Sequence, residues 1–245
     1  MILECAVYHV GYTAALHPTW CRADFGMRNT TTPVEVVLFD LGNVILPFDH
    51  QQIAEKLSRF AGQDRRDAPG LFRHLFDFEK GAVNLYETGK ISSEAFFQSL
   101  KESFHLSLSF EAFVPIWNQI FSENEEVSEI IRSLKRRLRL GLVSNTNPLH
   151  FDYIVARFPI VRAFDRWILS HQVGFKKPAL EIFQRAMEWA SVDPRRIVFI
   201  DDTETHVEAA AALGMQAIRF TSAGQLRKDL NESCGWKENG VRAGG

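Results

Sequence analysis

From residue 34 onward, short apolar runs alternate with longer segments in which apolar residues recur at helical spacing. This alternation limits the folds that the chain can adopt. The candidate strands are residues 34–39, 138–143, 166–169, 197–200 and 216–220, each four to six residues long and separated by helical segments of ten or more. Such a pattern is typical of βαβ units around a parallel sheet. We therefore expect an α/β fold with a doubly wound, Rossmann-like core.

One connection in this pattern is much too long for a single crossover. About a hundred residues separate Asp40 from Ser144, and up to residue 138 they have helical patterning. Four successive segments keep an apolar face, and their apolar residues are Ile53, Leu57 and Phe60; Leu71, Phe72, Leu75 and Phe76; Phe97, Leu100 and Phe104; and Phe113, Trp117 and Ile120. Apolar stripes at this spacing usually face inward. We expect a helical cap over residues 49–123, inserted directly after the first strand.

The remaining segments complete the predicted organisation. The core comprises residues 33–48 and 124–231, and residues 232–245 form a flexible tail. Residues 1–32 are expected to be a poorly ordered extension, because charged and polar residues interrupt their apolar positions and no basic segment precedes them as in a signal peptide. Met27 could be the true initiator.

Composition excludes several classes of function. A formal net charge of −2 gives no electrostatic reason to expect nucleic acid or an anionic membrane surface as a partner. No stretch approaches the roughly 18 apolar residues of a membrane helix. The three cysteines lack the spacing of a zinc site and do not suggest a disulfide framework, so a cytoplasmic location is expected.

Polar side chains follow four of the candidate strands. In chain order they are Asp40; Ser144, Asn145, Thr146 and Asn147; Lys176 and Lys177; and Asp201 and Asp202. In an open parallel sheet, ligands bind outside the carboxyl ends of the strands, so these groups should meet in one crevice. Taken singly, Asp40 could instead cap a turn, and the acidic pair could cap the helix that Thr203 begins.

A divalent ion would resolve the charge conflict in that crevice. Three clustered carboxylates with one lysine ammonium cannot all stay ionised without cost, because like charges raise each other's pKa. Hard oxygen ligands favour Mg²⁺, which often bridges to a substrate phosphate. The Ser144 hydroxyl, and free N–H groups at a helix start near Asn147 and Pro148, would suit an anion, and Lys177 would add a positive charge.

Four short motifs carry a family resemblance. The stretches FDLGNV, SNT, FKKP and FIDD occur in this order between residues 34 and 220. Together they resemble the signature of the haloacid dehalogenase-like hydrolase superfamily. The phrases DLGNVI, LVSNTN and KKPALEIF are further similar to a bacterial branch of sugar-phosphate phosphatases that acts on glucose 1-phosphate.

The resemblance implies a role for each motif residue. Asp40 would be the nucleophile that attacks phosphorus and becomes an aspartyl phosphate. Ser144, with Asn145 beside it, would bind the substrate's phosphoryl group, and Lys177 would neutralise charge there, whereas Lys176 is expected to be solvated. Asp40, Asp201 and Asp202 would hold Mg²⁺ through their carboxylates, directly or through water, and Gly42 through its backbone carbonyl.

Gly42 departs from the family pattern. Members usually carry a second aspartate at this position, whose side chain protonates the leaving group and later activates water. Glycine keeps the carbonyl and removes the acid/base, a group worth about 10²- to 10⁴-fold in rate. Asp49 or His50, just beyond the strand, could replace it. Alternatively, a leaving group that departs easily as an anion, such as the anomeric oxygen of a sugar 1-phosphate, would need less protonation.

Three readings of function remain at this point. The leading one is a Mg²⁺-dependent phosphatase whose substrate is a small phosphorylated metabolite. The second is a catalytically silent binding module, which Gly42 favours. The third is a haloacid dehalogenase, but that branch lacks the metal and the consecutive acidic pair, so Asp201 and Asp202 count against it. Sequence leaves the identity of the ester and the oligomeric state open.

Overall fold

The computed structural model describes residues 33–77, 81–234 and 236 of the chain. The prediction for residues 1–32 lies outside these residues, as does most of the predicted tail. Within the described part, the last helix, α11 (Ala223–Cys234), runs past residue 231, where we predicted that the core ends. Trp236 is buried against the core as well.

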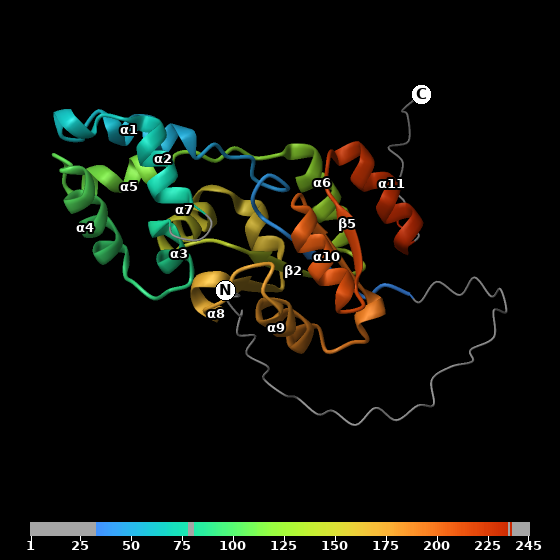
Figure 1. The fold of residues 1–245 in the computed structure, drawn as a ribbon. Helices are drawn as coiled ribbons and strands as arrows, with labels where there is room; N and C mark the ends of the chain where they lie inside the picture. Colours follow the sequence, from blue (N-terminus) through green and yellow to red (C-terminus); the bar gives the residue numbers. More distant parts are fainter. Residues whose placement is uncertain (1–32, 78–80, 235, 237–245) are drawn as a thin grey trace, which may run out of the picture. The chain divides into compact units, whose positions relative to one another are not determined.

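All five predicted strands form, and they build one parallel sheet. The strands are β1 (Val36–Phe39), β2 (Arg139–Ser144), β3 (Arg166–Leu169), β4 (Ile197–Asp201) and β5 (Gln216–Arg219). Their order in the sheet is β3-β2-β1-β4-β5, with every neighbouring pair parallel. The chain therefore leaves β1 in one direction to β2 and β3, and returns to its other side for β4 and β5. This confirms the doubly wound α/β core (Figure 1).

Helices occupy the connections between the strands (Figure 1). Between β1 and β2 lie α1 (Gln51–Ser58), α2 (Ala68–Phe76), α3 (Ala82–Glu87), α4 (Ser93–Phe104), α5 (Phe110–Asn118) and α6 (Glu125–Leu134). The later ones are α7 (Pro148–Arg157), α8 (Ser170–Val173), α9 (Leu180–Ala190) and α10 (Glu204–Ala212), with short 3₁₀ turns at Gln63–Arg65, Pro159–Ala163 and Pro194–Arg196. No helix in the described ranges is long and apolar enough to cross a bilayer.

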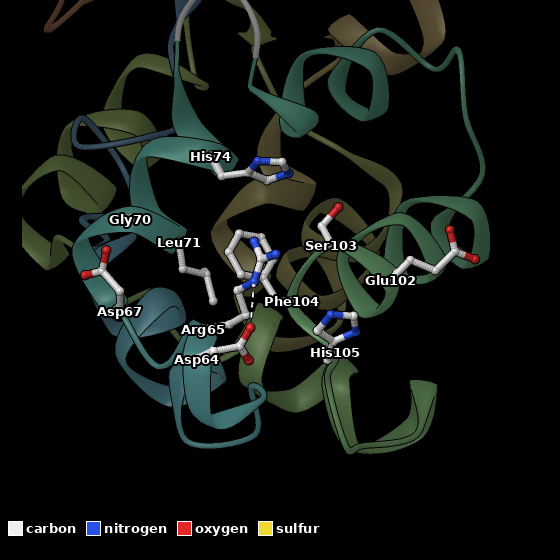
Figure 2. A pocket seen from close by; sticks show the side chains of 10 residues that line it. All are labelled: Asp64, Arg65, Asp67, Gly70, Leu71, His74, Glu102, Ser103, Phe104 and His105. Carbon is white, nitrogen blue, oxygen red and sulfur yellow. Dashed lines mark ion pairs between the residues drawn. The ribbon is translucent and has the colours of Figure 1, made fainter.

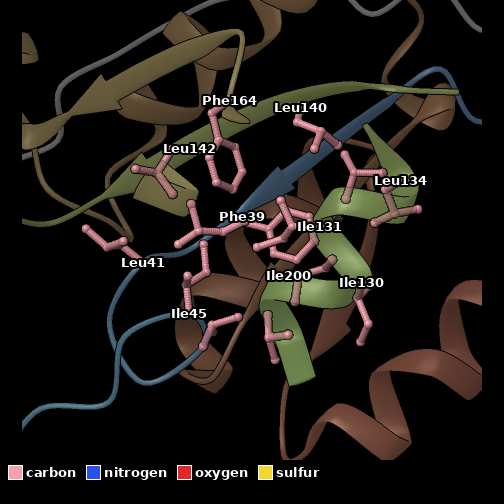
Figure 3. Close-up of a cluster of buried hydrophobic side chains, with 14 of the residues drawn as sticks. Phe39, Leu41, Ile45, Ile130, Ile131, Leu134, Leu140, Leu142, Phe164 and Ile200 are labelled. Atoms are coloured by element: carbon pink, nitrogen blue, oxygen red, sulfur yellow. The ribbon is translucent and has the colours of Figure 1, made fainter. Parts of the chain in front are cut away.

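Alternation along β1 divides the hydrophobic core between the two faces of the sheet. Val37 and Phe39 belong to a cluster with α6, α7 and α11. Figure 3 shows Phe39 beside Ile130, Ile131 and Leu134 of α6. Val36 and Leu38 point into a second cluster, formed with α9 and α10. Successive side chains of a strand face opposite sides, so a strand buried on both sides must be apolar throughout. This explains why β1 contains no polar residue and why its apolar run stops at Phe39, directly before Asp40.

The insertion has a hydrophobic core of its own, as its apolar stripes predicted. Phe96, Phe113 and Trp117 are fully buried there, with α4 and α5 starting at the N-caps Ser92 and Ser109. Phe60 is an exception, because α1 ends at Ser58 and leaves the Phe60 side chain 38% exposed. The clustering of these residues supports the cap boundaries that we propose, residues 49–123.

A buried polar network joins the insertion to α7. The Trp117 indole donates to Asn147 Oδ1 at 3.2 Å, and the His150 imidazole lies 3.1 Å from Asn147 Nδ2 and 2.9 Å from the Trp117 carbonyl. The Tyr86 hydroxyl accepts a hydrogen bond from the Leu149 backbone N–H at 3.2 Å. Partnered in this way, the imidazole of His150 can be buried without leaving polar atoms unsatisfied.

The burial of His150 predicts acid sensitivity. Burial, reinforced by the nearby His50, lowers the pKa of His150 from 6.5 to about 3. The unfolded chain then binds more protons than the folded chain between these values, so stability should fall as the pH drops through that window. The slope from this one group is at most about 1.4 kcal/mol per pH unit. Urea unfolding from pH 8 to pH 4 measures it, and His150→Gln should flatten the curve; identical slopes would contradict the assignment.

Candidate active site

The carboxyl ends of β1 and β4 bring two of the predicted site residues together. Asp40 follows β1, and Asp201 is the last residue of β4. These strands are neighbours at the point where the strand order reverses, and the Asp40 backbone N–H donates to the Ile200 carbonyl at 2.8 Å. Open α/β sheets bind ligands at this point. The register of the sheet thus fixes the separation of the two carboxylates.

Lys177 lies between these two carboxylates. Its ammonium is 2.6 Å from Asp40 Oδ1 and 2.7 Å from Asp201 Oδ2, and the side chain is almost fully buried. Asn145 holds the lysine in place, because its side-chain oxygen accepts from the Lys177 backbone N–H at 2.7 Å and its amide donates to the Lys177 carbonyl at 3.0 Å. The third and first motifs are therefore joined by a buried ion pair.

Burial and this ion pair set the charge states. Burial raises the pKa of Asp40 to about 6, against the opposing effect of Lys177 and with a further contribution from Asp201. Burial would lower the pKa of Lys177, but the two carboxylates outweigh it and raise the value. For Asp201, burial is outweighed by Lys177 and His206, which lower its pKa. Asp40 is therefore less readily ionised than an exposed aspartate, and the main reason is its burial.

The acidic side chains fit a hard divalent cation. Asp40, Asp201 and Asp202 each offer one carboxylate oxygen, and these three atoms lie within 4.8 Å of one another. Oxygen donors at this density suit Mg²⁺, which also keeps several water ligands. His206 was not predicted to belong to the site, yet its Nδ1 lies 3.0 Å from Asp201 Oδ1. Its position, one turn into the helix after Asp202, was the only signal that could have identified it.

The predicted anion site at the start of α7 is wrong in one respect. Its N–H groups are not free, since Leu149 N–H binds the Tyr86 hydroxyl, while His150 N–H binds Asn147 Oδ1 and Phe151 N–H binds the Asn147 carbonyl. Pro148 has no N–H to offer. The helix start is satisfied by protein groups, so any anion must rely on other donors.

Ser144 is the motif residue whose placement contributes least. It ends β2 and is buried, but it does not line the cavity described below. Its hydroxyl makes only a 3.5 Å contact with the Asn145 carbonyl, too long for a good hydrogen bond. That hydroxyl is still available to a ligand oxygen, and its role stays a prediction. The side chain of Asn145, by contrast, is committed to Lys177, which makes it a positioning residue.

Gly42 lies in the turn after Asp40 and lines the cavity. Its carbonyl accepts a hydrogen bond from the Val44 N–H at 2.6 Å. A Cβ atom placed on Gly42 would come within 2.6 Å of Phe48 Cε1, closer than real Cβ atoms approach a neighbour. The ring of Phe48 thus fills the space into which a side chain at position 42 would project. Position 42 therefore carries no acidic side chain, and the space that such a side chain would need is occupied by Phe48.

This packing predicts coupling between positions 42 and 48. Gly42 has no positive φ, so Gly42→Ala would be neutral or slightly stabilising if the space were open. With Phe48 in place, we expect a loss of about 1–3 kcal/mol from overpacking. In the Phe48→Ala background the same change should cost nothing. Urea unfolding of the four proteins gives the coupling free energy, and strict additivity would contradict this packing.

The carboxylates open into a cavity of about 370 Å³ between the core and the insertion. Its core side is lined by Asp40, Gly42, Asn43, Phe48, Asn145, Lys176, Lys177, Asp202, Thr203 and His206, and its other side by His50, Phe72, Leu75, Phe76, Val83, Asn84 and Glu87. We predicted a solvated Lys176, but its ammonium lies 2.5 Å from Glu87 Oε2 and 2.9 Å from Asn84 Oδ1. Lys176 therefore fastens α3 to the core beside the cavity.

A larger hollow of about 640 Å³ lies on the insertion alone (Figure 2). It is lined by Asp64, Arg65, Asp67, Gly70, Leu71, His74, Glu102, Ser103, Phe104 and His105. None of the motif residues borders it, and Asp64 is already paired with Arg65. Size therefore does not identify the reactive site, whereas the convergence of carboxylates and a buried lysine does.

Comparison with known proteins gives a consistent answer. A family model described as haloacid dehalogenase-like hydrolase matches residues 34–214. The chain is 26% identical over 210 residues to a D-ribitol-5-phosphate phosphatase of Bacteroides thetaiotaomicron, covering 80% of this chain and 97% of the relative. It is 24% identical to a phosphorylated carbohydrates phosphatase of Thermotoga maritima, covering 76% and 84%.

Solved structures agree with this likeness. A haloacid dehalogenase family enzyme from Bacteroides thetaiotaomicron, in complex with magnesium and inorganic phosphate, superposes with a TM-score of 0.68 at 25% identity. The match covers 78% of this chain and 96% of that one. An L-2-haloacid dehalogenase from Xanthobacter autotrophicus superposes with a TM-score of 0.55 at 17% identity, which speaks for the fold alone.

Proposed function

The chain belongs to the haloacid dehalogenase-like hydrolase family, and we propose that it is a Mg²⁺-dependent phosphatase that hydrolyses a small phosphorylated sugar or polyol. The observation that carries this proposal is the joining of Asp40 and Asp201 by the buried ammonium of Lys177, with Asp202 close by. The names of the phosphatase relatives support the substrate class. The consecutive acids at 201 and 202 argue against a dehalogenase, as they did in the sequence.

Each residue then has a defined task. Asp40 attacks phosphorus, the bond from phosphorus to the leaving oxygen breaks, and an aspartyl phosphate forms. Lys177 offsets the negative charge that Asp40 and the phosphoryl oxygens share. Asp40, Asp201 and Asp202 would hold Mg²⁺, with the Gly42 carbonyl as a further oxygen ligand; when bound, the ion neutralises phosphate charge. His206 and Asn145 keep Asp201 and Lys177 in position.

The cavity restricts the substrate to a small molecule. Its volume of about 370 Å³ is at the low end for a metabolite site. Its lining combines aromatic and aliphatic groups with Asn84, Glu87 and Lys176, a mixture that suits a polyhydroxylated carbon chain. With no acid at position 42, the favoured esters are those whose leaving oxygen departs readily as an anion. Glucose 1-phosphate, with its anomeric oxygen, meets both conditions.

A substrate panel tests this proposal. With Mg²⁺ present, phosphate release should be measured for aryl phosphates of graded leaving-group acidity, and for sugar 1-phosphates, sugar 6-phosphates and polyol phosphates. We expect the rate of the chemical step to rise steeply with leaving-group acidity, and sugar 1-phosphates to be favoured over primary phosphates of the same sugar. A flat dependence would contradict the leaving-group argument. Mg²⁺ binding without any phosphate release would instead favour a silent binding module.

A further inference from the structure

Because Gly42 has no acid/base side chain, the proposed reaction lacks a group that accepts a proton from the attacking water. Hydrolysis of the aspartyl phosphate needs a group that takes a proton from the attacking water, whatever the leaving group of the first step was. No residue has been assigned to this task. Two side chains just beyond β1, Asp49 and His50, are the nearest in sequence, and the structure separates them clearly.

Asp49 is occupied elsewhere. Its side chain is exposed and accepts a hydrogen bond from the Gln51 backbone N–H at 2.9 Å, which caps the start of α1. It does not line the cavity that contains Asp40. A carboxylate that serves a helix end at the surface is poorly placed to act on a water molecule at the phosphorus.

His50 lines the same cavity as Asp40. Its ring stacks on Phe76, with centroids 4.2 Å apart and planes inclined by 9°, and it packs against Phe48 at 4.4 Å. Phe48 is the residue that fills the space above Gly42. Phe48 therefore packs both over Gly42 and against His50, so the missing side chain at position 42 and the placement of His50 depend on the same ring.

The imidazole nitrogens of His50 are not committed to a hydrogen bond. In the described part of the chain they have no hydrogen-bond partner, and they are not among the fully enclosed polar atoms without one. His150 provides the contrast, since both of its ring nitrogens are hydrogen-bonded and its role is structural. A histidine that lines the reactive cavity, is held by two aromatic rings and has unused ring nitrogens is a candidate for proton transfer.

We propose that His50 is the general base that activates water for hydrolysis of the aspartyl phosphate. This rests on the proposed phosphatase function. The water oxygen attacks phosphorus, the bond from phosphorus to the Asp40 oxygen breaks, and its electron pair returns to the carboxylate. The water proton passes to an unprotonated ring nitrogen of His50 and then to solvent. In the first step the leaving group departs as an anion and takes its proton from solvent.

The charge state of His50 is compatible with this task. Burial lowers its pKa to about 4, with Asp49 opposing the shift and Lys176 adding to it. The ring is therefore neutral at neutral pH and has a lone pair for the proton. The same shift makes it a poor acid for the first step, which agrees with a substrate whose leaving group needs no protonation.

Rapid mixing of 4-nitrophenyl phosphate with the Mg²⁺-loaded enzyme separates the two steps. His50→Phe keeps the aromatic stack and removes the nitrogens. We expect its first turnover to release nitrophenol within about twofold of the wild-type rate, followed by a steady state slowed about 10²-fold, the low end for a lost general base. The burst should approach one nitrophenol per chain, with phosphate trapped on the protein after acid quench.

A second variant with a smaller side chain, His50→Ala, tests the role of His50 even if the His50→Phe protein does not fold. His50→Ala opens space beside Phe76, and added imidazole should restore its steady-state rate at least tenfold, a rescue that a purely structural role would not show. His74→Phe is the matched control, because His74 packs edge-on to Phe104 and lines only the hollow on the insertion. It should leave both steps unchanged.

The remaining outcomes contradict the role of His50. An unchanged steady state in both His50 variants overturns it, and so does an equal slowing of both steps without a burst, which would assign His50 to substrate binding. Failure of imidazole rescue in a folded His50→Ala protein also overturns it. A wild type that releases no nitrophenol would overturn the proposed phosphatase function itself, so the two failures are distinguishable.

Discussion

Asp40→Asn should abolish turnover, lowering kcat by at least about 10⁴-fold, because the carboxamide cannot attack phosphorus to form the aspartyl phosphate. Asparagine matches aspartate in shape, and its side-chain oxygen can still accept the hydrogen bond from Lys177 that is 2.6 Å long in the parent chain. The measurement is Mg²⁺-dependent phosphate release from an aryl phosphate, together with acid quench to detect protein-bound phosphate, which should disappear.

Asp49→Asn is the matched control for this substitution. Asp49 caps α1, and asparagine caps a helix about as well, so both activity and stability should stay near the wild-type values. Loss of activity in this control, or residual turnover in Asp40→Asn above 1 part in about 10³, would contradict the assignment of Asp40 as nucleophile.

Lys177→Met should have the largest effect on stability. The change leaves Asp40 and Asp201 buried without the ammonium that now lies 2.6 and 2.7 Å from them. Breaking a buried ion pair by removing one partner costs about 3–5 kcal/mol. We expect a loss of this size in urea unfolding at pH 7 without metal, with part of it recovered when Mg²⁺ is added. Activity should fall as well, by about 10²-fold or more, because charge on the phosphoryl group is no longer offset.

Two comparisons make the Lys177 result specific. Lys176→Met removes a partly exposed pair with Glu87 and should cost no more than about 1 kcal/mol. Adding Asp40→Asn to Lys177→Met removes one of the two facing carboxylates, so the double variant should be more stable than Lys177→Met alone. A Lys177→Met protein as stable as the wild type, or one insensitive to Mg²⁺, would show that the two carboxylates are not held together by this lysine.

The sheet could be predicted because its strands are short, apolar and buried on both faces. A strand such as β4, with five buried residues in a row, leaves little choice of secondary structure. The convergence of Asp40, Lys177 and Asp201 followed from the general rule for strand ends in parallel sheets. The family identification and the fold class were therefore both accessible from sequence, and both are confirmed.

What could not be predicted depends on contacts between distant segments. Lys176 pairs with Glu87, some ninety positions away, so its charge alone suggested a solvated side chain. The N–H of Leu149 is satisfied by Tyr86, a residue of the insertion, which no local capping pattern indicates. The same is true of Gly42, since the ring that fills its side-chain space belongs to Phe48 beyond the turn. The sequence identifies these residues as candidates, but it does not indicate which distant residues they contact.

The bond between Tyr86 and Leu149 bears on how the insertion could be exchanged in a chimaera. Helix α7 belongs to the core, yet two of its contacts come from the insertion. The Tyr86 hydroxyl accepts the hydrogen bond of the Leu149 N–H, and the Trp117 ring stacks on His150. A foreign lid grafted in place of residues 49–123 would have to bring a hydroxyl to Leu149 and an indole or similar ring to His150. A replacement that lacked the hydroxyl would leave the Leu149 N–H unpaired, so in this chain the insertion should be exchanged together with the first turn of α7.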